Sequence, residues 1–184
     1  PGRKTDIGDA QWLATLARAG LLRGSFVPPA KLRELRLIAR QRQKLVGLLS
    51  SEKNRMHKVL TDAGVRLGVV VSDLHGQSAR AMIKGILQGQ APNEVLALAS
   101  RRLKASREVL HDALQGELTA SHLFVLDELL RHIEELEARI ARFDARLLHE
   151  LASEHNALAL LQTLPGVDTI GAAMLLVEIG SDMS

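Results

Sequence analysis

The feature that most constrains this chain is an apolar heptad pattern between residues 119 and 155. Its positions alternate spacings of three and four residues, and we call them the heptad stripe: Leu126, Leu129, Ile133, Leu136, Ile140, Phe143 and Leu147. A period of 3.5 residues predicts a long helix that packs against another long helix. The partner is either the helix expected over 30–63, in an antiparallel hairpin, or the same helix of a second chain, in which case the stripe mediates dimerisation. An ordinary amphipathic bundle helix is the alternative.

A second long helix is predicted from Pro29 or Ala30 to about residue 63, where Gly64 ends it. Its apolar residues also fall on a seven-residue repeat, namely Leu35, Ile38, Leu45, Leu49, Met56, Val59 and Ala63. Arg42 and Glu52 interrupt that repeat. At 1.5 Å per residue such a helix would be ~50 Å long.

The composition excludes several classes of protein. Aromatic residues make up only 2% of the 184 residues, whereas hydrophobic residues make up 46%. A β-sandwich or barrel would need more β-branched and aromatic residues, and a base-stacking surface would need aromatic side chains. Cys is absent, so there is no disulfide framework, thiolate zinc site or cysteine nucleophile. We therefore expect an all-α fold built on a long helical hairpin or coiled coil.

Shorter elements are expected around the two long helices. Residues 9–19 predict a helix with one apolar face that includes Trp12, and Val69-Val70-Val71 is a brief β-like run. Further helices are predicted from a cap at Ser72 to about Gly89, then over 92–103, 104–115 and, as a pair, 158–179. That last pair resembles a helix-hairpin-helix unit.

Charge is distributed unevenly along the chain. Residues 1–66 hold 14 Lys and Arg against 5 Asp and Glu, whereas residues 67–184 hold 10 against 16. An excess of cations suggests an anionic partner such as DNA or RNA, although a solvated helix face would look the same. The cations expected to track a phosphate backbone, which we call the α-helical cations, are Lys31, Arg33, Arg36, Arg40, Arg42, Lys44, Lys53, Arg55 and Lys58.

Two carboxylates lie three residues apart where the first helix is expected to begin. At this spacing Asp6 and Asp9 can face the same side of a helical turn. Converging carboxylates suit Mg²⁺, which prefers oxygen ligands. The alternative is that one of them caps the helix.

The turn between the last two helices is a second candidate phosphate site. Backbone amides near Gly166, Val167 and Thr169 could hold a DNA phosphate without reading sequence. However, Asp168 stands where the helix-hairpin-helix pattern has a second glycine, and this carboxylate weakens the interpretation. A plain αα-hairpin explains the pattern equally well.

Other chemistry is not indicated by the sequence. The seven His show no spacing typical of a metal site, and there is no glycine-rich phosphate loop or Ser-His-Asp arrangement. No apolar run approaches the roughly 20 residues of a membrane span.

Several segments in this order resemble one family. They are KTDIGDAQWLATLARAGLLRGSFVPP, RELRLIARQRQKLVGLLSSEKNRMHKVL, GVVVSDLHGQSARAMIKGIL, the heptad stripe, and LLQTLPGVDTIGAAMLLVEIGSDMS. Together they are similar to DEDD-type transposases of the insertion-sequence one-ten family, which are RNA-guided DNA recombinases of bacteria. The resemblance implies a cytoplasmic, nucleoid-associated protein with DNA and a guide RNA as partners and a homo-oligomeric state.

The resemblance also implies a division of the chain and a catalytic role for its first acids. Residues 1–28 would end a RuvC-like domain, 29–156 would form the coiled-coil region, and 157–184 would begin a C-terminal transposase domain. Asp6 and Asp9 match the last two of four acidic residues that bind Mg²⁺. The other two acids would lie before Pro1 and the nucleophilic serine after Ser184, so we expect this chain to be an internal fragment with weak metal affinity and no activity of its own.

The functional prediction is therefore a fragment of a transposase that cleaves and exchanges DNA strands. Its rival is a non-enzymatic helical dimerisation or DNA-binding scaffold module, which explains the heptads equally well but not the charge distribution. A helix-hairpin-helix repair-type DNA binder is a third interpretation.

Overall fold

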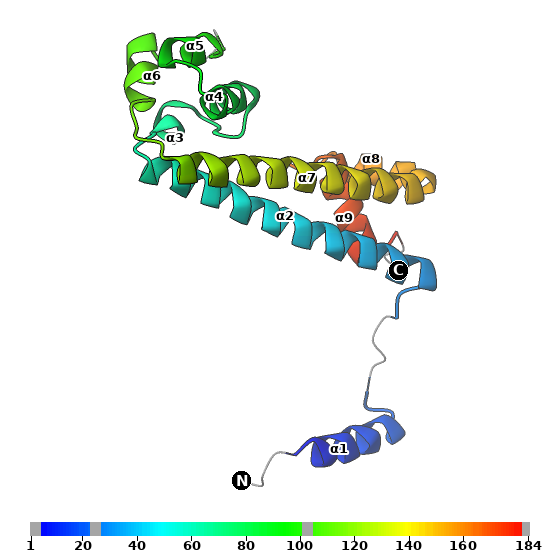
Figure 1. Ribbon diagram of the computed structural model, residues 1–184. Coiled ribbons are helices and arrows are strands. Elements are labelled where there is room, and N and C mark those ends of the chain that lie inside the picture. Colours follow the sequence, from blue (N-terminus) through cyan, green and yellow to red (C-terminus); the bar gives the residue numbers. More distant parts are fainter. Residues whose placement is uncertain (1–4, 23–26, 101–104, 182–184) are drawn as a thin grey trace.

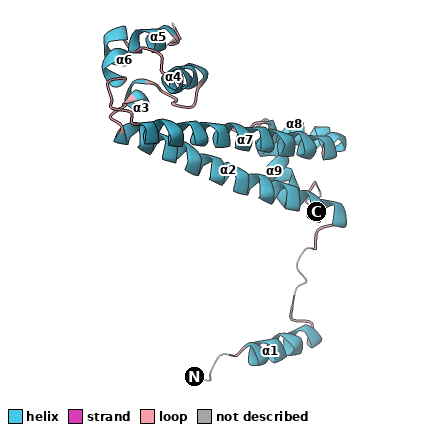
Figure 2. Ribbon diagram, in the orientation of Figure 1, coloured by secondary structure: helices cyan, strands magenta, loops and turns pink. Residues whose placement is uncertain are grey.

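The computed structural model describes residues 5–22, 27–100 and 105–181. Every regular element within these ranges is helical (Figure 2), which confirms the predicted all-α class. The helices are α1 (Asp6–Arg18), α2 (Ala30–Asp62), α3 (Leu67–Val70), α4 (Gln77–Leu87), α5 (Pro92–Ala97), α6 (Arg107–Ala113), α7 (Ala120–Glu150), the 3-10 turn η1 (Ala152–Glu154), α8 (His155–Leu161) and α9 (Thr169–Ile179).

The two long helices, α2 and α7, lie side by side in an antiparallel hairpin (Figure 1). Near the tip, Leu60 of α2 shares a buried cluster with Leu126 of α7. At the open end, Leu35 shares another with Leu147. The heptad stripe thus packs against α2 of the same chain, the first of the two partners that the sequence left open.

The buried face of α7 is wider than the stripe that the sequence predicts. Five stripe residues are buried, whereas Leu129 and Phe143 are only partly buried. Leu130, which lies outside the stripe, is 4% exposed. The reason is that the first half of α7 contacts α4 as well as α2, so a second side of the helix is covered there.

The two polar interruptions of the α2 heptads have partners inside the hairpin. Arg42 forms an ion pair with Asp144 of α7, and the side chains are 16% and 25% exposed. Glu52 is buried and accepts a 2.8 Å hydrogen bond from Arg55, while His132 Nδ1 of α7 lies 3.8 Å away. The breaks in the apolar pattern therefore mark polar contacts of the seam.

Residues 65–100 and 105–118 form a small helical head at the tip of the hairpin, containing α3, α4, α5 and α6 (Figure 1). The amide of Arg66 donates a 2.8 Å hydrogen bond to the carbonyl of Ala113. A Cβ at Gly116 would lie 2.4 Å from the carbonyl oxygen of Ala63, so this close approach requires glycine. The head is therefore joined closely to the end of α2.

The β-like run predicted at 69–71 is wrong. Leu67–Val70 forms the short helix α3, and only Val71 is extended. The amides of Val69 and Val71 bond to the carbonyls of Arg66 and Leu67. Within the described residues no strand is available as a partner, so the backbone satisfies its polar groups locally instead.

Several helix ends differ from the sequence prediction. Ser72 caps nothing, because α4 begins later and has Gly76 as its N-cap. Helix α5 ends at Ala97, and the stretch predicted beyond it lies partly outside the described residues. Helix α6 is capped by Ser106, whose hydroxyl accepts from the amide of Val109.

Helices α8 and α9 close the open end of the hairpin. Ala172, Ala173, Leu176 and Val177 of α9 are buried against Leu35 and Ala39 of α2 and Leu147 of α7 in one cluster. This packing places the carboxyl end of α9 beside the first turns of α2.

Helix α1 stands apart from the helical body (Figure 1), and none of its residues is buried. It begins three residues earlier than predicted because Thr5 is the N-cap, and its hydroxyl accepts a 3.2 Å hydrogen bond from the amide of Gly8. Trp12 and Leu13, on the apolar face expected to pack, are 63% and 53% exposed.

Candidate nucleic-acid interface

The acid pair lies in the first turn of α1. Asp6 and Asp9 are both exposed, and they lie three residues apart on one helical turn, as the sequence predicts. Because Thr5 supplies the cap, neither carboxylate is needed for that purpose. The two side chains thus remain available as oxygen donors at the positive end of the helix dipole.

These two donors suit Mg²⁺ chemically but do not make a complete cage. No group of three or more His, Cys, Asp or Glu side chains that could hold a metal ion occurs among the described residues. Two carboxylates neutralise the charge of a divalent ion, yet they leave most of its coordination positions to water or to other ligands.

Five of the α-helical cations are engaged by neighbouring groups, and Arg40, with Glu178 of α9, is one of them. Arg42 pairs with Asp144, and Lys53 Nζ lies 3.3 Å from Glu137 Oε1. Arg55 bonds to Glu52 within α2. Arg36 is only 19% exposed and donates to two backbone carbonyls of α9. Apart from the Arg55 contact, which lies within α2, these contacts join α2 to α7 or α9.

Three other α-helical cations remain unengaged. Lys31, Lys44 and Lys58 are exposed and make no hydrogen bond or ion pair with any residue in the described ranges. Arg33 donates only to the carbonyl of Pro28, at 2.8 Å. These side chains keep their charge available to solvent or to an anionic partner.

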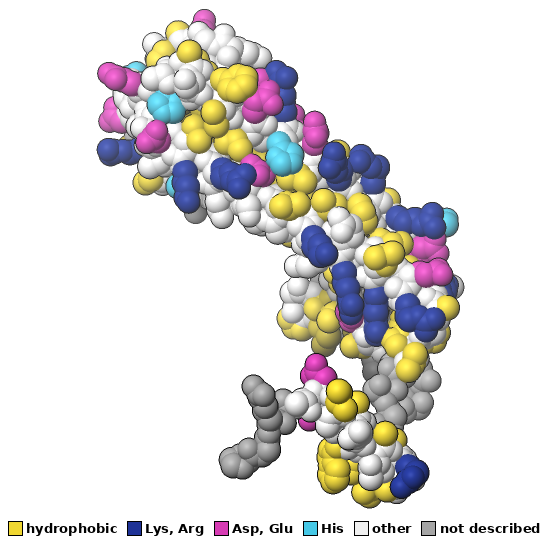
Figure 3. Space-filling view, turned by 60° about the horizontal axis from the view of Figure 1, so that its bottom comes forward, with side chains coloured by type: hydrophobic (Ala, Val, Ile, Leu, Met, Phe, Trp, Pro, Cys, Tyr) yellow, Lys and Arg dark blue, Asp and Glu magenta, His cyan; other side chains and the backbone are white. Residues whose placement is uncertain are grey.

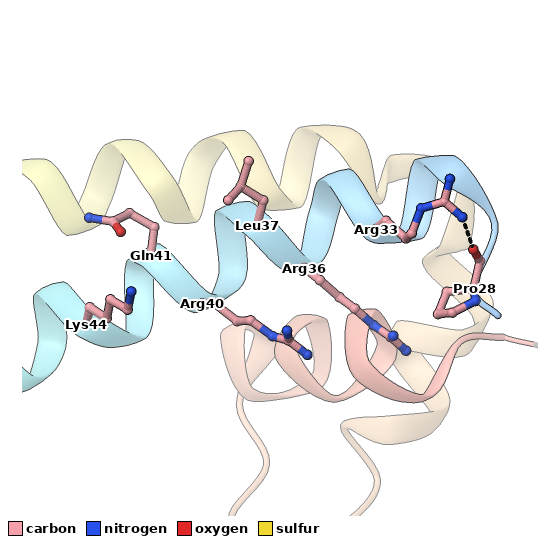
Figure 4. A pocket seen from close by; sticks show the side chains of 7 residues that line it. All are labelled: Pro28, Arg33, Arg36, Leu37, Arg40, Gln41 and Lys44. Carbon is pink, nitrogen blue, oxygen red and sulfur yellow. Dashed lines mark hydrogen bonds between the residues drawn. The ribbon is translucent and has the colours of Figure 1, made fainter. Parts of the chain in front are cut away.

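The first half of α2 carries a shallow groove of about 450 Å³, and four of the α-helical cations line it (Figure 4). We call it the α2 groove, and its lining residues are Pro28, Arg33, Arg36, Leu37, Arg40, Gln41 and Lys44. In the space-filling view, Lys and Arg gather on this part of the surface beside apolar patches (Figure 3). A groove with four cationic side chains and no acidic one in its lining suits a phosphate backbone better than a cationic or apolar ligand.

Arg36 and Arg40 extend from the groove toward α9 (Figure 4). Arg40 Nε and Nη2 each lie 3.2 Å from a carboxylate oxygen of Glu178. The Arg40 hydrogen bonds hold the pKa of the Glu178 carboxyl below its usual value of 4.5, and the same contact raises the pKa of Arg40. An acidic side chain therefore adjoins the groove at its side next to α9.

The turn between α8 and α9 has the geometry of a capped αα-hairpin. Gly166 has φ 84, a left-handed conformation that favours glycine. The amide of Val167 bonds to the carbonyl of Leu164, and Thr169 Oγ1 donates to Gln162. Asp168 is the N-cap of α9 and accepts a 2.6 Å hydrogen bond from the amide of Gly171.

That cap bears on the phosphate site predicted at Gly166, Val167 and Thr169. The Asp168 carboxylate already accepts a hydrogen bond from the amide of Gly171 in the first turn of α9, and its charge would repel an incoming phosphate. A role for this turn in nucleic-acid binding stays a prediction, and the α2 groove is the stronger candidate.

The heptad stripe is the third predicted site, for dimerisation. Leu126, Ile133, Leu136, Ile140 and Leu147 are buried against α2 of the same chain, with Leu129 and Phe143 beside them. A dimer made through these residues would require the hairpin to open and exchange helices. Dimerisation through the stripe stays a prediction.

The comparisons with known proteins give one match. A family model for DEDD transposases of the insertion-sequence one-ten group (IS110), described as "Transposase", matches residues 1–64. Residues 1–64, about a third of the chain, are therefore similar to this transposase family. The matched stretch contains Asp6, Asp9 and the whole of α2 with its groove. No match was found among the curated proteins or the solved structures.

The transposase match supports a general role in transposition and an interaction with DNA. Among the described residues, no helix combines the length and the apolar character needed to cross a membrane. These findings direct attention to the charged surface of α2.

Sequence reasoning missed Pro28, Leu37 and Gln41 of the groove lining, and also Glu178 beside it. Leu37 and Gln41 line the groove at helical spacing from Arg33 and Lys44, so the 3.6-residue period could have found them. Glu178 gave no such signal, because it follows Arg40 by 138 residues and is brought there only by the packing of α9.

Proposed function

We propose that this chain is part of a transposase that cleaves and exchanges DNA strands at the ends of an insertion sequence under the guidance of an RNA. The observation that carries the proposal is the transposase match over residues 1–64, which places the acid pair and the α2 groove in one family segment. The proposed division is 1–28 as the end of a RuvC-like domain, 29–156 as the coiled-coil region and 157–184 as the start of a transposase domain.

Asp6 and Asp9 would hold Mg²⁺ together with acids supplied from outside this chain. Their exposure and their placement on one turn support this role, because both carboxylates can reach the same ion. The metal would stabilise the charge that develops on the phosphate during strand cleavage. Thr5 positions the pair by capping the helix that carries it.

The α2 groove would hold the sugar-phosphate backbone of DNA or of the guide RNA. Exposed Arg33 and Lys44 of the groove provide charge, together with exposed Lys31 in the first turn of α2. None of the side chains that line the groove is aromatic, as stacking on bases would require. Binding would therefore be independent of sequence and would weaken steeply with salt.

The catalytic role is tested by replacing Asp6 with Asn and Asp9 with Asn together in the full-length parent protein. We expect loss of excision and insertion, because the variant removes two of the metal's carboxylates. Asp112→Asn, an exposed acid of α6, is the matched control and should retain activity. Wild-type excision by the double variant would remove the pair from the chemistry.

The binding role is tested on this 184-residue chain by fluorescence anisotropy with a DNA duplex. The triple variant Lys31→Gln, Arg33→Gln and Lys44→Gln should bind more weakly, with a plot of log affinity against log salt that is shallower by about 2–3. The control removes the same charge from α7, with Arg131→Gln, Arg139→Gln and Arg146→Gln, whose guanidinium groups pair with neighbouring acids.

The outcomes separate the transposase from its rival. No binding by the wild-type chain at low salt would favour the non-enzymatic scaffold. Equal losses in the two triple variants would show that only net charge matters and would contradict the groove as the site.

A further inference from the structure

The α2 groove adjoins an acidic side chain that competes for one of its cations. Glu178, near the end of α9, reaches Arg40 with both carboxylate oxygens at 3.2 Å. Its backbone carbonyl also accepts a 2.5 Å hydrogen bond from Arg36 Nη2. Glu178 Oε2 also lies 3.5 Å from Arg36 Nε. The Glu178 side chain thus contacts both groove arginines that extend toward α9, and its backbone carbonyl contacts Arg36 as well.

The two arginines are held in different ways. Arg36 is 19% exposed and binds the carbonyls of Val177 and Glu178, which are unpaired acceptors at the carboxyl end of a helix. Arg40 is 65% exposed, and among the described residues its side chain bonds only to the Glu178 carboxylate. Arg36 therefore anchors α9, whereas Arg40 can exchange its partner without uncovering the core.

An exposed ion pair of this kind is easily displaced. Exposed salt bridges contribute little net free energy, so a phosphate that makes other contacts in the groove can replace the carboxylate on Arg40. The planar guanidinium can donate two parallel hydrogen bonds to a phosphate, as it does to a carboxylate. While Glu178 remains in place, however, its negative charge repels the phosphate.

We propose that Glu178 is an electrostatic gate on the α2 groove: it occupies Arg40 in the free chain, and a backbone phosphate of DNA or RNA replaces it on binding. This inference rests on the proposed function, because it takes the groove to be a site for a phosphate backbone. Binding of a phosphate to Arg40 and the contact of the Glu178 carboxylate with Arg40 are then mutually exclusive. By linkage, occupancy of the groove loosens α9, and loosening of α9 strengthens binding.

The first test compares Glu178→Gln with the wild-type chain at moderate salt. The probes are a DNA duplex and an RNA hairpin of unrelated sequence, and the affinities for the two identify which backbone the groove prefers. We expect Glu178→Gln to bind roughly threefold to tenfold more tightly, because one adjacent negative charge is removed. The gain should vanish when Arg40→Gln is also present.

Glu150→Gln is the matched control, since it removes the same charge from an ion pair with Arg146 on α7. An equal gain in this control, or no gain in Glu178→Gln, would overturn the gate while leaving the groove as a binding site. If the wild-type chain binds neither probe at low salt, the proposed interface fails and the gate fails with it.

A second test uses the wild-type chain alone and so does not depend on a variant. Amide hydrogen exchange within residues 169–179 should become faster when the duplex is bound, because α9 loses its side-chain contact with Arg40. Unchanged or slower exchange in α9, with binding demonstrated in the same sample, would overturn the proposal.

Discussion

At the residue scale, the polar positions inside the hairpin set the register of its two helices. Arg42 meets Asp144 and Glu52 lies near His132, each pair joining α2 to α7. A shift of the helices by one heptad would separate both pairs and leave charged groups in a largely apolar seam. The interruptions in the heptad pattern thus favour one alignment, as polar residues at such positions do in other coiled coils.

Glu137 of α7 also forms polar contacts between helices, and these include a helix of the head. Arg80 of α4 donates hydrogen bonds of 2.8 and 2.6 Å to its two oxygens, and Lys53 of α2 lies 3.3 Å away. The Arg80 hydrogen bonds lower the pKa of the Glu137 carboxyl, and burial raises it by less. The pKa therefore lies below its usual value of 4.5. This carboxylate joins three helices and is ionised at neutral pH.

A pH dependence follows from that shift. Because the folded pKa is depressed, the contribution of Glu137 is complete above the unfolded pKa near 4.5 and is lost as pH falls through the lower folded value. Glu137→Gln should therefore lower the free energy of unfolding at pH 7. The loss should be about 1 kcal/mol or less, because the Glu137 side chain is one-third exposed. The difference from wild type should shrink toward pH 3.

Urea unfolding followed by circular dichroism at pH 7, 5 and 3 measures this effect. Glu135→Gln is the control, because its side chain is 65% exposed and lies 3.9 Å from Arg139 at the nearest atoms. A difference between Glu137→Gln and wild type that stays constant with pH would contradict the assignment.

At the element scale, stability is concentrated in the seam between α2 and α7. Leu136 is 1% exposed and packs with Leu45 and Ile140 midway along the hairpin. The hairpin there is only two helices thick, so few neighbours can move to fill a gap.

We expect Leu136→Ala to lower the free energy of unfolding by about 2–4 kcal/mol, through lost burial and the cavity that remains. Leu37→Ala is the same substitution at a residue that is 73% exposed, and it should change the free energy by less than about 0.5 kcal/mol. Urea denaturation of both variants measures the contrast. Equal effects would show that the stripe does not face α2.

The long helices could be predicted from sequence because a heptad pattern is a local and repeated signal. The predicted α2 range of 30–63 differs from the observed Ala30–Asp62 by one residue. The short elements were harder, since Val69 and its neighbours have high β-propensity but no strand to pair with among the described residues. Leu130 was missed for a related reason: only the tertiary placement of α4 covers that side of α7.

Some features of the candidate site could likewise be predicted from the sequence, and others could not. The cations of α2 could be read from composition, but their roles could not, because Asp144 and Glu178 lie more than a hundred residues along the chain from Arg42 and Arg40. The sequence could suggest that Asp6 and Asp9 share a turn, whereas it gave Thr5 no role as the cap.

At the scale of the whole molecule, α1 is separate from the helical body. None of its residues is buried, and Trp12, the single tryptophan, is 63% exposed. Its fluorescence therefore reports on α1 alone, whereas circular dichroism is dominated by the long hairpin.

We expect Trp12 to emit as a solvent-exposed indole in the native chain and to change little through the urea transition that circular dichroism detects. The physical reason is that unfolding of the hairpin exposes no further indole surface. A blue-shifted native emission that moves in the same transition would show that α1 docks on the body.

The antiparallel course of the hairpin also fixes a length. Helix α9 ends beside the start of α2, where a Cβ at Gly180 would lie 3.6 Å from Leu32 Cδ2, and the head caps the opposite tip. With 33 residues rising 1.5 Å each, α2 is about 50 Å long. The hairpin therefore sets a fixed distance between a partner bound to the head and a partner bound at the α9 end.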